Sequence, residues 1–289
     1  MSASRARLRQ VAQRLLSDRD KVDGVVSGLS LTKLPRSDMA NVPIRASSIT
    51  VIIQGSRRLT LGTQSFLLEE FGFLINALPL PIVEDTGRAD GDAPYMAIEL
   101  AFDLALAERV RSGMPGRIAG LVSSSVAMTG TPSWMCDCFR RMLEISVADN
   151  PDGRLVDLLQ QEFMLRLLAH PSGRALHQLT LPGSHLARVY RAVRYIIDRF
   201  REPLVVADLA TFCNWSPSSL HHQFRRLTTM TPLQYQQFLR LSQARHLLLT
   251  TQMQAGEVAS HVGYSSANQF NREYRRLFGA PPIISVSVL

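Results

Sequence analysis

Apolar residues near the start of the chain recur three and four positions apart. Leu8, Val11, Ala12, Leu15 and Leu16 share this spacing within residues 4–16. Positions so spaced lie on one face of a helix. We therefore expect an amphipathic helix to open the protein, within a first segment that covers residues 1–27.

The pattern changes between Gly28 and about Leu106. Short runs rich in β-branched and apolar residues, such as SITVIIQG and SFLLEEFGFLINA, are separated by the turn-forming sequences GSRR, LGTQ, LPLP and DTGRADGDAP. Short strands divided by such turns are typical of antiparallel sheets. The sequence predicts a small antiparallel sheet or barrel in this region.

Helical periodicity returns near Leu104 and dominates the rest of the chain. Residues 132–147 and 152–170 each carry an apolar stripe, and the second stripe contains Leu155, Leu159, Phe163 and Leu167. These stripes either cover the sheet or pair two subunits, and the sequence favours neither. Proline and glycine then interrupt the pattern, which places a connecting segment at residues 171–185, between a domain at 28–170 and a second one at 186–289.

Two stretches of the second domain share one design, VADLATFCNWSPSSLHHQFRRLT and AGEVASHVGYSSANQFNREYRRLFG. Small Ala210 and Ala259 allow two helices to cross closely, and Asn214 and Gly263 tolerate the positive φ of a tight turn. Ser216 before Pro217 begins one following helix, and Ser265 or Ser266 caps the other. This predicts helix-turn-helix units at about 205–228 and 255–278, whose second helices can enter a DNA major groove.

The second helix of each unit divides into two faces. Leu220, Phe224 and Leu227 should pack inward in the first, and Phe270, Tyr274 and Leu277, with Phe278, in the second. The outward faces then carry Ser218, His221, His222, Arg225 and Arg226, and Asn268, Gln269, Asn271, Arg272, Arg275 and Arg276. Such side chains bind base edges and phosphates. The alternative is that both are solvated faces of an ordinary helical bundle.

Charge is distributed unevenly along the chain, whose net charge is +8. Residues 183–289 contain 12 arginines and five acidic residues, a net charge of +7, whereas the remainder carries +1. This asymmetry predicts a polyanionic partner for the second domain only. The charged start and the absence of a run of about 18 apolar residues predict a cytoplasmic protein without a membrane span. Binding to DNA would associate it with the nucleoid.

Few residues suggest catalytic chemistry. The first histidine is His170, beyond the predicted strands, so we expect no histidine-ligated metal there, no cofactor and no enzymatic activity. Cys136 and Cys138 are either buried small side chains or a redox or ligand-sensing pair. Arg57, Arg58 and Arg88 lie in solvated turns or meet an anionic effector.

The stretch from about 187 to 282 resembles the DNA-binding domain of the AraC/XylS family of bacterial regulators. The residues that carry the likeness are DLATFCNWSPSSLHHQF, TPLQYQQFLRLSQARHLLL and VASHVGYSSANQFNREYRRLFGAPP, and the middle segment, 232–249, resembles the family's linker helix. Asn214 and Thr229 stand where glycine is usual. The resemblance implies base reading by Ser218, His221, His222, Ala267, Asn268, Asn271 and Arg272. Phosphate contacts fall on Arg225, Arg226, Gln269, Arg275 and Arg276.

Residues 28–170 resemble, more loosely, the N-terminal domain of one branch of that family. This implies an α+β protein with a cupin-like β-barrel and flanking helices, joined to an all-α domain of two helix-turn-helix units and a linker helix. The implied function is sequence-specific transcription regulation, with duplex DNA, a small-molecule effector, a second subunit and RNA polymerase as partners. The alternatives are an architectural DNA-binding protein without sequence preference and a ligand-binding cupin with a helical appendage.

Overall fold

A computed structural model of the chain describes residues 3–34, 46–61, 64–80, 82–85, 94–114, 124–148 and 150–282. The chain divides into two compact units, and the change from the first to the second falls between Ala187 and Arg188. The first unit combines antiparallel strands with helices, and the second is helical. The structure thus has the two-domain α+β organisation expected from the sequence.

The first unit contains two antiparallel sheets. The larger has the strand order β1-β2-β8-β3-β6-β9 and the smaller β5-β4-β7. The bounds are α1 (Ala3–Leu15), β1 (Lys21–Asp23), β2 (Leu29–Leu34), β3 (Ser48–Gln54), β4 (Arg57–Leu61), β5 (Gln64–Leu68), β6 (Gly72–Asn76), β7 (Val83–Asp85), β8 (Tyr95–Ala101), α2 (Leu104–Ser112), β9 (Val126–Gly130), α3 (Ser133–Ser146), α4 (Gly153–Ala169), η1 (Pro171–Gly173) and α5 (Arg174–Leu179).

The expected antiparallel strands are present, but the expected β-barrel is not closed among the described residues, since the two sheets share no ladder. The chain leaves the larger sheet at the end of β3, where the register with β8 shifts between Ile52 and Gln54. Gly55, at φ 85°, then turns it into β4 of the smaller sheet. A bulge followed by a left-handed glycine bends the strand, so β3 and β4 do not pair.

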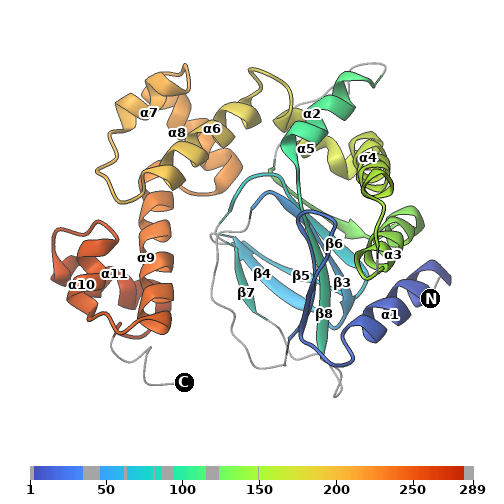
Figure 1. Cartoon of the computed structure of the whole chain (residues 1–289). Helices are drawn as coiled ribbons and strands as arrows, with labels where there is room; N and C mark the ends of the chain where they lie inside the picture. Colours follow the sequence, from blue (N-terminus) through green and yellow to red (C-terminus); the bar gives the residue numbers. More distant parts are fainter. Residues whose placement is uncertain are drawn as a thin grey trace. The chain divides into compact units, whose positions relative to one another are not determined.

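One part of the core of the first unit lies between the larger sheet and its helices. Alternate residues of a strand point to opposite faces. Phe73 of β6 meets the His170 ring with centroids 6.4 Å apart, and the guanidinium groups of Arg5 and Arg9 lie over the ring of Phe71. The face that carries these rings is therefore the one that α1, α3 and α4 cover, and Figure 1 shows these helices along one side of the sheet.

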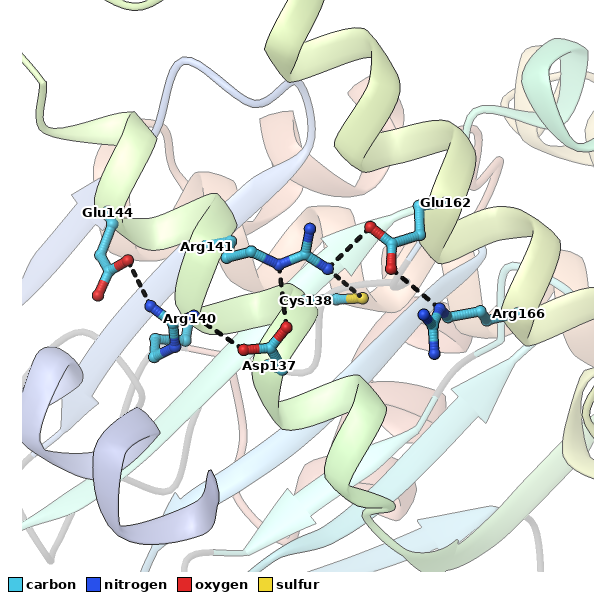
Figure 2. Close-up of polar contacts among 7 residues, drawn as sticks. All are labelled: Asp137, Cys138, Arg140, Arg141, Glu144, Glu162 and Arg166. Carbon is cyan, nitrogen blue, oxygen red and sulfur yellow. Dashed lines mark hydrogen bonds and ion pairs between the residues drawn. The ribbon is translucent and has the colours of Figure 1, made fainter. Parts of the chain in front are cut away.

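Charged residues tie α3 to α4 (Figure 2). Arg141 of α3 donates from Nη2 to Glu162 Oε2 of α4 at 2.8 Å and from Nε to Asp137 Oδ2 at 3.0 Å. Arg166 pairs with the other oxygen of Glu162 at 3.0 Å. Hydrogen bonding from Arg140 lowers the pKa of Asp137, so the Asp137 carboxylate stays charged. The ion pair between Arg141 and Glu162 joins the two helices.

The cysteines are buried and free. Burial raises the pKa of Cys136 to about 11 and also raises the pKa of Cys138. A thiol reacts as its thiolate, and these thiols are protonated at neutral pH. The structure therefore favours their interpretation as small core side chains.

The second unit is built from helices α6 (His185–Asp198), α7 (Val206–Phe212), α8 (Pro217–Thr228), α9 (Pro232–Thr250), α10 (Ala255–His261) and α11 (Ala267–Phe278). The long α9 runs between the pair α7–α8 and the pair α10–α11 (Figure 1). Residues 171–185, for which the sequence predicts a connecting segment, contain η1 and α5. Within the described part of the chain, every helix is too short or too polar to cross a bilayer.

Candidate nucleic-acid interface

The pair α7–α8 has the local features that its sequence predicts. Ala210 is fully buried where the two helices meet. Asn214 turns the chain at φ 54°, and Trp215 donates its backbone N–H to the carbonyl of Ala210 at 2.9 Å. The hydroxyl of Ser216 accepts from Ser219 N at 3.2 Å, which caps α8. A side-chain cap satisfies one of the unpaired N–H groups at a helix start.

The faces of α8 are divided as expected. Leu220, Phe224 and Leu227 are buried, and Phe224 packs edge-on against Tyr235 of α9. The residues expected to face outward are Ser218, His221, His222, Arg225 and Arg226, of which all but Arg226 are exposed. Arg226 is half-buried, and its Nε has no hydrogen-bond partner among the described residues.

The pair α10–α11 repeats the design with a glycine turn. Ala259 is buried at the helix contact, and Gly263 turns the chain at φ 93°. The hydroxyl of Ser266, one of the two candidate caps, accepts from Gln269 N at 3.3 Å. Gly279 ends α11 at φ 77°, a left-handed position that Thr229 occupies at φ 65° after α8. Asn214 and Thr229, which stand where glycine is usual, thus both adopt the left-handed conformation.

One inward residue of α11 was predicted wrongly. Phe270 and Tyr274 are fully buried, but Leu277 is 38% exposed. Its place against the core is taken by Phe278, whose ring lies 4.6 Å from that of Tyr274 and is covered by the guanidinium of Arg245. In the last turn of α11 the residue that packs against the core is therefore Phe278 and not Leu277. The spacing of apolar residues alone did not distinguish between these two neighbours.

The outward face of α11 is mostly polar and carries three arginines. Its exposed residues are Ala267, Asn268, Gln269, Asn271, Arg272, Arg275 and Arg276. A hollow of about 460 Å³ is lined by Asn271, Arg272, Arg275, Arg276, Pro281 and Pro282. Three guanidinium groups around one hollow create a positive potential that suits phosphate oxygens.

Two polar residues of α11, Gln269 and Glu273, are hydrogen-bonded within the protein. Gln269 donates from Nε2 to Glu273 Oε1 at 3.0 Å, and Tyr264 donates from its hydroxyl to Glu273 Oε2 at 2.8 Å. Burial opposes ionisation of Glu273, but hydrogen bonds from Gln269, Tyr264 and Gln237 lower its pKa below the ordinary value. The carboxylate thus stays charged and fixes the Gln269 side chain on the outward face.

Helix α9 separates the two outward helices. It begins in a capping box formed by Thr231 and Gln234 and continues for 19 residues. At about 1.5 Å per residue it spans about 28 Å. This agrees with the linker helix expected at 232–249.

Two polar residues of α9 that contact the turn after α6 were not predicted. Gln236 is buried, and both Gln236 and Arg240 donate to backbone carbonyls of residues 200–202. A polar residue on the buried side of a helix is the one signal that indicates such a contact. For metal binding, the described residues bring together no group of three or more candidate ligands.

Two family models match the chain. The model of the AraC-type transcriptional regulator N-terminus matches residues 25–175, and that of a helix-turn-helix domain matches residues 209–283. The first spans more than half of the chain and the second contains most of both helix pairs.

Individual relatives match over shorter stretches. The arabinose operon regulatory protein of Escherichia coli (strain K12) is 31% identical over 140 residues, 48% of this chain and 47% of that protein. The HTH-type transcriptional regulator GbdR of Pseudomonas aeruginosa is 34% identical over 100 residues, 35% of this chain and 27% of that protein. The chain thus spans half or less of the length of these curated relatives.

A solved structure shares the fold over most of its length. ToxT from Vibrio cholerae aligns with a TM-score of 0.60 at 10% identity, over 90% of this chain and 98% of that one. At this identity the likeness concerns the fold alone.

Proposed function

The chain belongs to the family of AraC-type transcriptional regulators, and on that premise we propose that it reads specific DNA sequences through α8 and α11. The observation that carries the proposal is the repeated geometry of the second unit. Each of these helices follows a left-handed turn, begins at a serine cap and exposes a polar face. In this proposal α7–α8 and α10–α11 are two helix-turn-helix units, each with its second helix in a major groove.

Base reading is assigned to the N-terminal, outward residues of both helices. In α8 these are Ser218, His221 and His222, and in α11 they are Ala267, Asn268, Asn271 and Arg272. Arg272 has the bidentate geometry that suits guanine, and Asn268 the donor and acceptor that suit adenine. The exposure of all seven residues supports the assignment.

Phosphate binding is assigned to the flanks of the same faces, at Arg225, Arg226, Gln269, Arg275 and Arg276. The hollow beside Arg275 and Arg276 supports this for α11. Contacts of this kind position a protein on the duplex without reading its sequence. Of this set Arg226 is half-buried, and the other four residues are exposed.

The length of α9 supports reading of adjacent grooves. Successive major-groove segments on one side of B-form DNA are about 34 Å apart. Because α9 spans about 28 Å, helices packed at its two ends lie at a compatible separation.

For the first unit, in which the family resemblance implies a cupin-like fold, we propose effector sensing. Asn76 and Leu74 alternate with Phe73 and Ile75 along β6, so they point away from the helix-covered face. Asn76 is 1% exposed and pairs in register with Ser48 and Val126. Neither atom of its side-chain amide has a hydrogen-bond partner among the described residues.

An unsatisfied buried amide costs about 1–3 kcal/mol, which a ligand with a hydroxyl or carbonyl group would offset. We therefore expect a neutral polar effector at this face. One structure of ToxT was solved with an unsaturated fatty acid bound, so effector binding accompanies this fold in at least that protein.

Dimerisation is proposed through α4. Leu155, Leu158 and Leu165 are 48%, 60% and 48% exposed, and their spacing places them on one side of the helix. Leu159, Phe163 and Leu167 of the same helix are buried. We therefore assign these three residues to the core of the unit and the three exposed leucines to the contact with a second subunit. A contact with RNA polymerase and the lack of enzymatic activity stay predictions from the family.

A DNA selection tests the function. Purified protein is incubated with random duplexes, the bound fragments are sequenced, and the affinity for a selected site is compared with that for random DNA across a salt series. We expect a preference of about 10³-fold or more, on a background of binding that falls steeply with salt. Equal affinity for the selected site and for random DNA at every salt concentration would favour the architectural alternative. The absence of any DNA binding would contradict both the proposed function and that alternative.

A further inference from the structure

The turn that follows α6 is held by two side chains of α9. Arg240 donates from Nε to the carbonyl of Phe200 at 2.7 Å, and from Nη2 to those of Arg201 at 3.1 Å and Glu202 at 2.9 Å. Gln236 donates from Nε2 to Phe200 O at 3.0 Å and to Glu202 O at 2.7 Å. Hydrogen bonds from a charged donor are stronger than neutral ones, so this turn is firmly attached to α9.

The same turn lies directly against the second helix pair. A Cβ atom at Gly263 would stand 2.3 Å from the carbonyl oxygen of Arg201, far inside van der Waals contact. The side chain of Phe200 packs on the hydrophobic cluster that contains Val258, Phe270 and Tyr274. The turn after α6 is therefore part of the packing of α10–α11.

Helix α6 itself contacts the first helix pair. Arg191 donates to the carbonyl of Phe212 at 2.9 Å and Arg188 donates to that of Asn214 at 3.2 Å. The ring of Tyr195 lies 5.0 Å from that of Phe212. These contacts reach the end of α7 and the turn into α8, so α6 and the turn after it touch both pairs.

We infer that α6 and the turn at 199–202 form a second connection between the two helix-turn-helix units, and that Arg240 and Gln236 are positioning residues that fix the orientation of α8 relative to α11. The inference rests on the proposed function, since it concerns how two reading helices are aligned. Helix α9 alone joins the pairs through one contact region at each end. The second connection removes the remaining freedom to tilt or rotate.

The attachment extends towards the reading face of α11. The guanidinium of Arg240 lies 5.8 Å from the ring centre of Tyr264, whose hydroxyl donates to Glu273. Glu273 in turn accepts from Gln269, which is exposed beside the residues assigned to base reading. Loss of the Arg240 side chain therefore removes a contact of Tyr264, the residue that is hydrogen-bonded to Glu273 of α11.

Rigid alignment has a measurable consequence. When two binding modules are held in the geometry of their target, binding of the first makes binding of the second intramolecular, which raises the overall affinity. This gain in affinity is lost when the relative orientation of the modules is not fixed. A loosened pair binds each half of its DNA site as before, but binds the whole site less tightly and tolerates altered spacing.

The test compares Arg240→Ala with Arg245→Ala in the full-length protein. Both variants remove one guanidinium from α9, but Arg245 lies over Phe278 and makes none of the carbonyl contacts. The probes are the selected site, the same site with one base pair inserted between its halves, and sites with either half scrambled. Gln236→Met, which replaces the uncharged side-chain amide with a thioether of similar length and changes no charge, serves as the second test variant.

We expect Arg240→Ala to weaken binding to the intact site about tenfold and to reduce the penalty of the inserted base pair. Its binding to each single half should stay within about twofold of the wild-type protein, and Arg245→Ala should keep the wild-type spacing preference. Equal losses on intact and half sites, or an unchanged spacing preference in both Arg240→Ala and Gln236→Met, would overturn the inference.

A measurement without DNA separates this inference from the proposed function. Spin labels at His222→Cys and Asn271→Cys report the distance between α8 and α11, and the native cysteines are buried. We expect a narrow distance distribution that broadens in Arg240→Ala and Gln236→Met. Unchanged width would overturn the inference even if DNA reading holds, whereas failure of the DNA selection with a broadened distribution would overturn the proposed function alone.

Discussion

The two helix pairs of the second unit reach the same geometry through different turn residues. Asn214 is exposed, and its carbonyl accepts from Arg188, so its side chain has room. Gly263 lies beneath the carbonyl of Arg201, where a Cβ has no space. Both turns require a left-handed residue, but only the second also requires a residue without a side chain. Gly263 thus marks the place where the backbone of another segment approaches, in addition to forming the turn.

The two faces proposed to read DNA differ as well. Helix α8 offers a serine and two histidines, whereas α11 offers two asparagines and an arginine beside a hollow that two further arginines line. Asparagine and arginine make the most selective contacts with base edges. We therefore expect α11 to contribute more to sequence preference and α8 to contribute more to placement.

The largest effect on stability is expected from alanine at Gly263, and the same substitution at Asn214 provides the comparison. Gly263→Ala should lower the free energy of unfolding of the second unit by about 3 kcal/mol, because backbone strain adds to the clash with Arg201. Asn214→Ala should cost only about 1 kcal/mol, the penalty of a left-handed alanine. Urea unfolding followed by Trp215 fluorescence, in a Trp134→Phe background, measures both. Similar losses in the two variants would mean that the turns are equivalent.

Arg272→Ala addresses the reading faces. It should weaken binding to a selected site by about 1–3 kcal/mol and relax the preference at one base position, because a bidentate contact is lost. The matched change in α8, His222→Ala, should have a smaller effect. Competition between selected and random duplexes provides the measurement, and a loss on random DNA as large as on selected DNA would exclude base reading by Arg272.

The serine caps should behave alike in the two pairs. Ser216→Ala and Ser266→Ala each remove a side-chain acceptor from the first turn of the outward helix. Each should lower the free energy of unfolding by about 1 kcal/mol. If one change is neutral and the other is not, the two helix starts do not share their design.

The smallest effect is expected from a single phosphate contact. Arg225→Ala should weaken binding to all sequences by the same small factor and lower the slope of log affinity against log salt by about 0.9. Arg275→Ala provides the equivalent change in α11. A sequence-dependent loss in either variant would move that arginine from phosphate binding to base reading.

Local features of the second unit were predictable from the sequence, and long-range contacts were not. Ser216, Asn214 and the apolar spacing of α8 act within a few residues, so their patterns are visible in the chain. Gly263 is visible as a turn residue, but its close approach to Arg201 is not. The attachment of Arg240 to a turn about 40 residues earlier leaves no such pattern. The open sheets of the first unit likewise depend on which strands pair after Gly55, and no spacing of apolar residues specifies that.

The spacing of base contacts tests the central claim most directly. Methylation of guanine N7 blocks the major groove, so interference by single methyl groups maps where the protein enters it. On a selected site we expect two clusters of interfering guanines about 10 base pairs apart, on one side of the duplex. A single cluster, or two clusters on opposite sides, would contradict reading by two aligned helices.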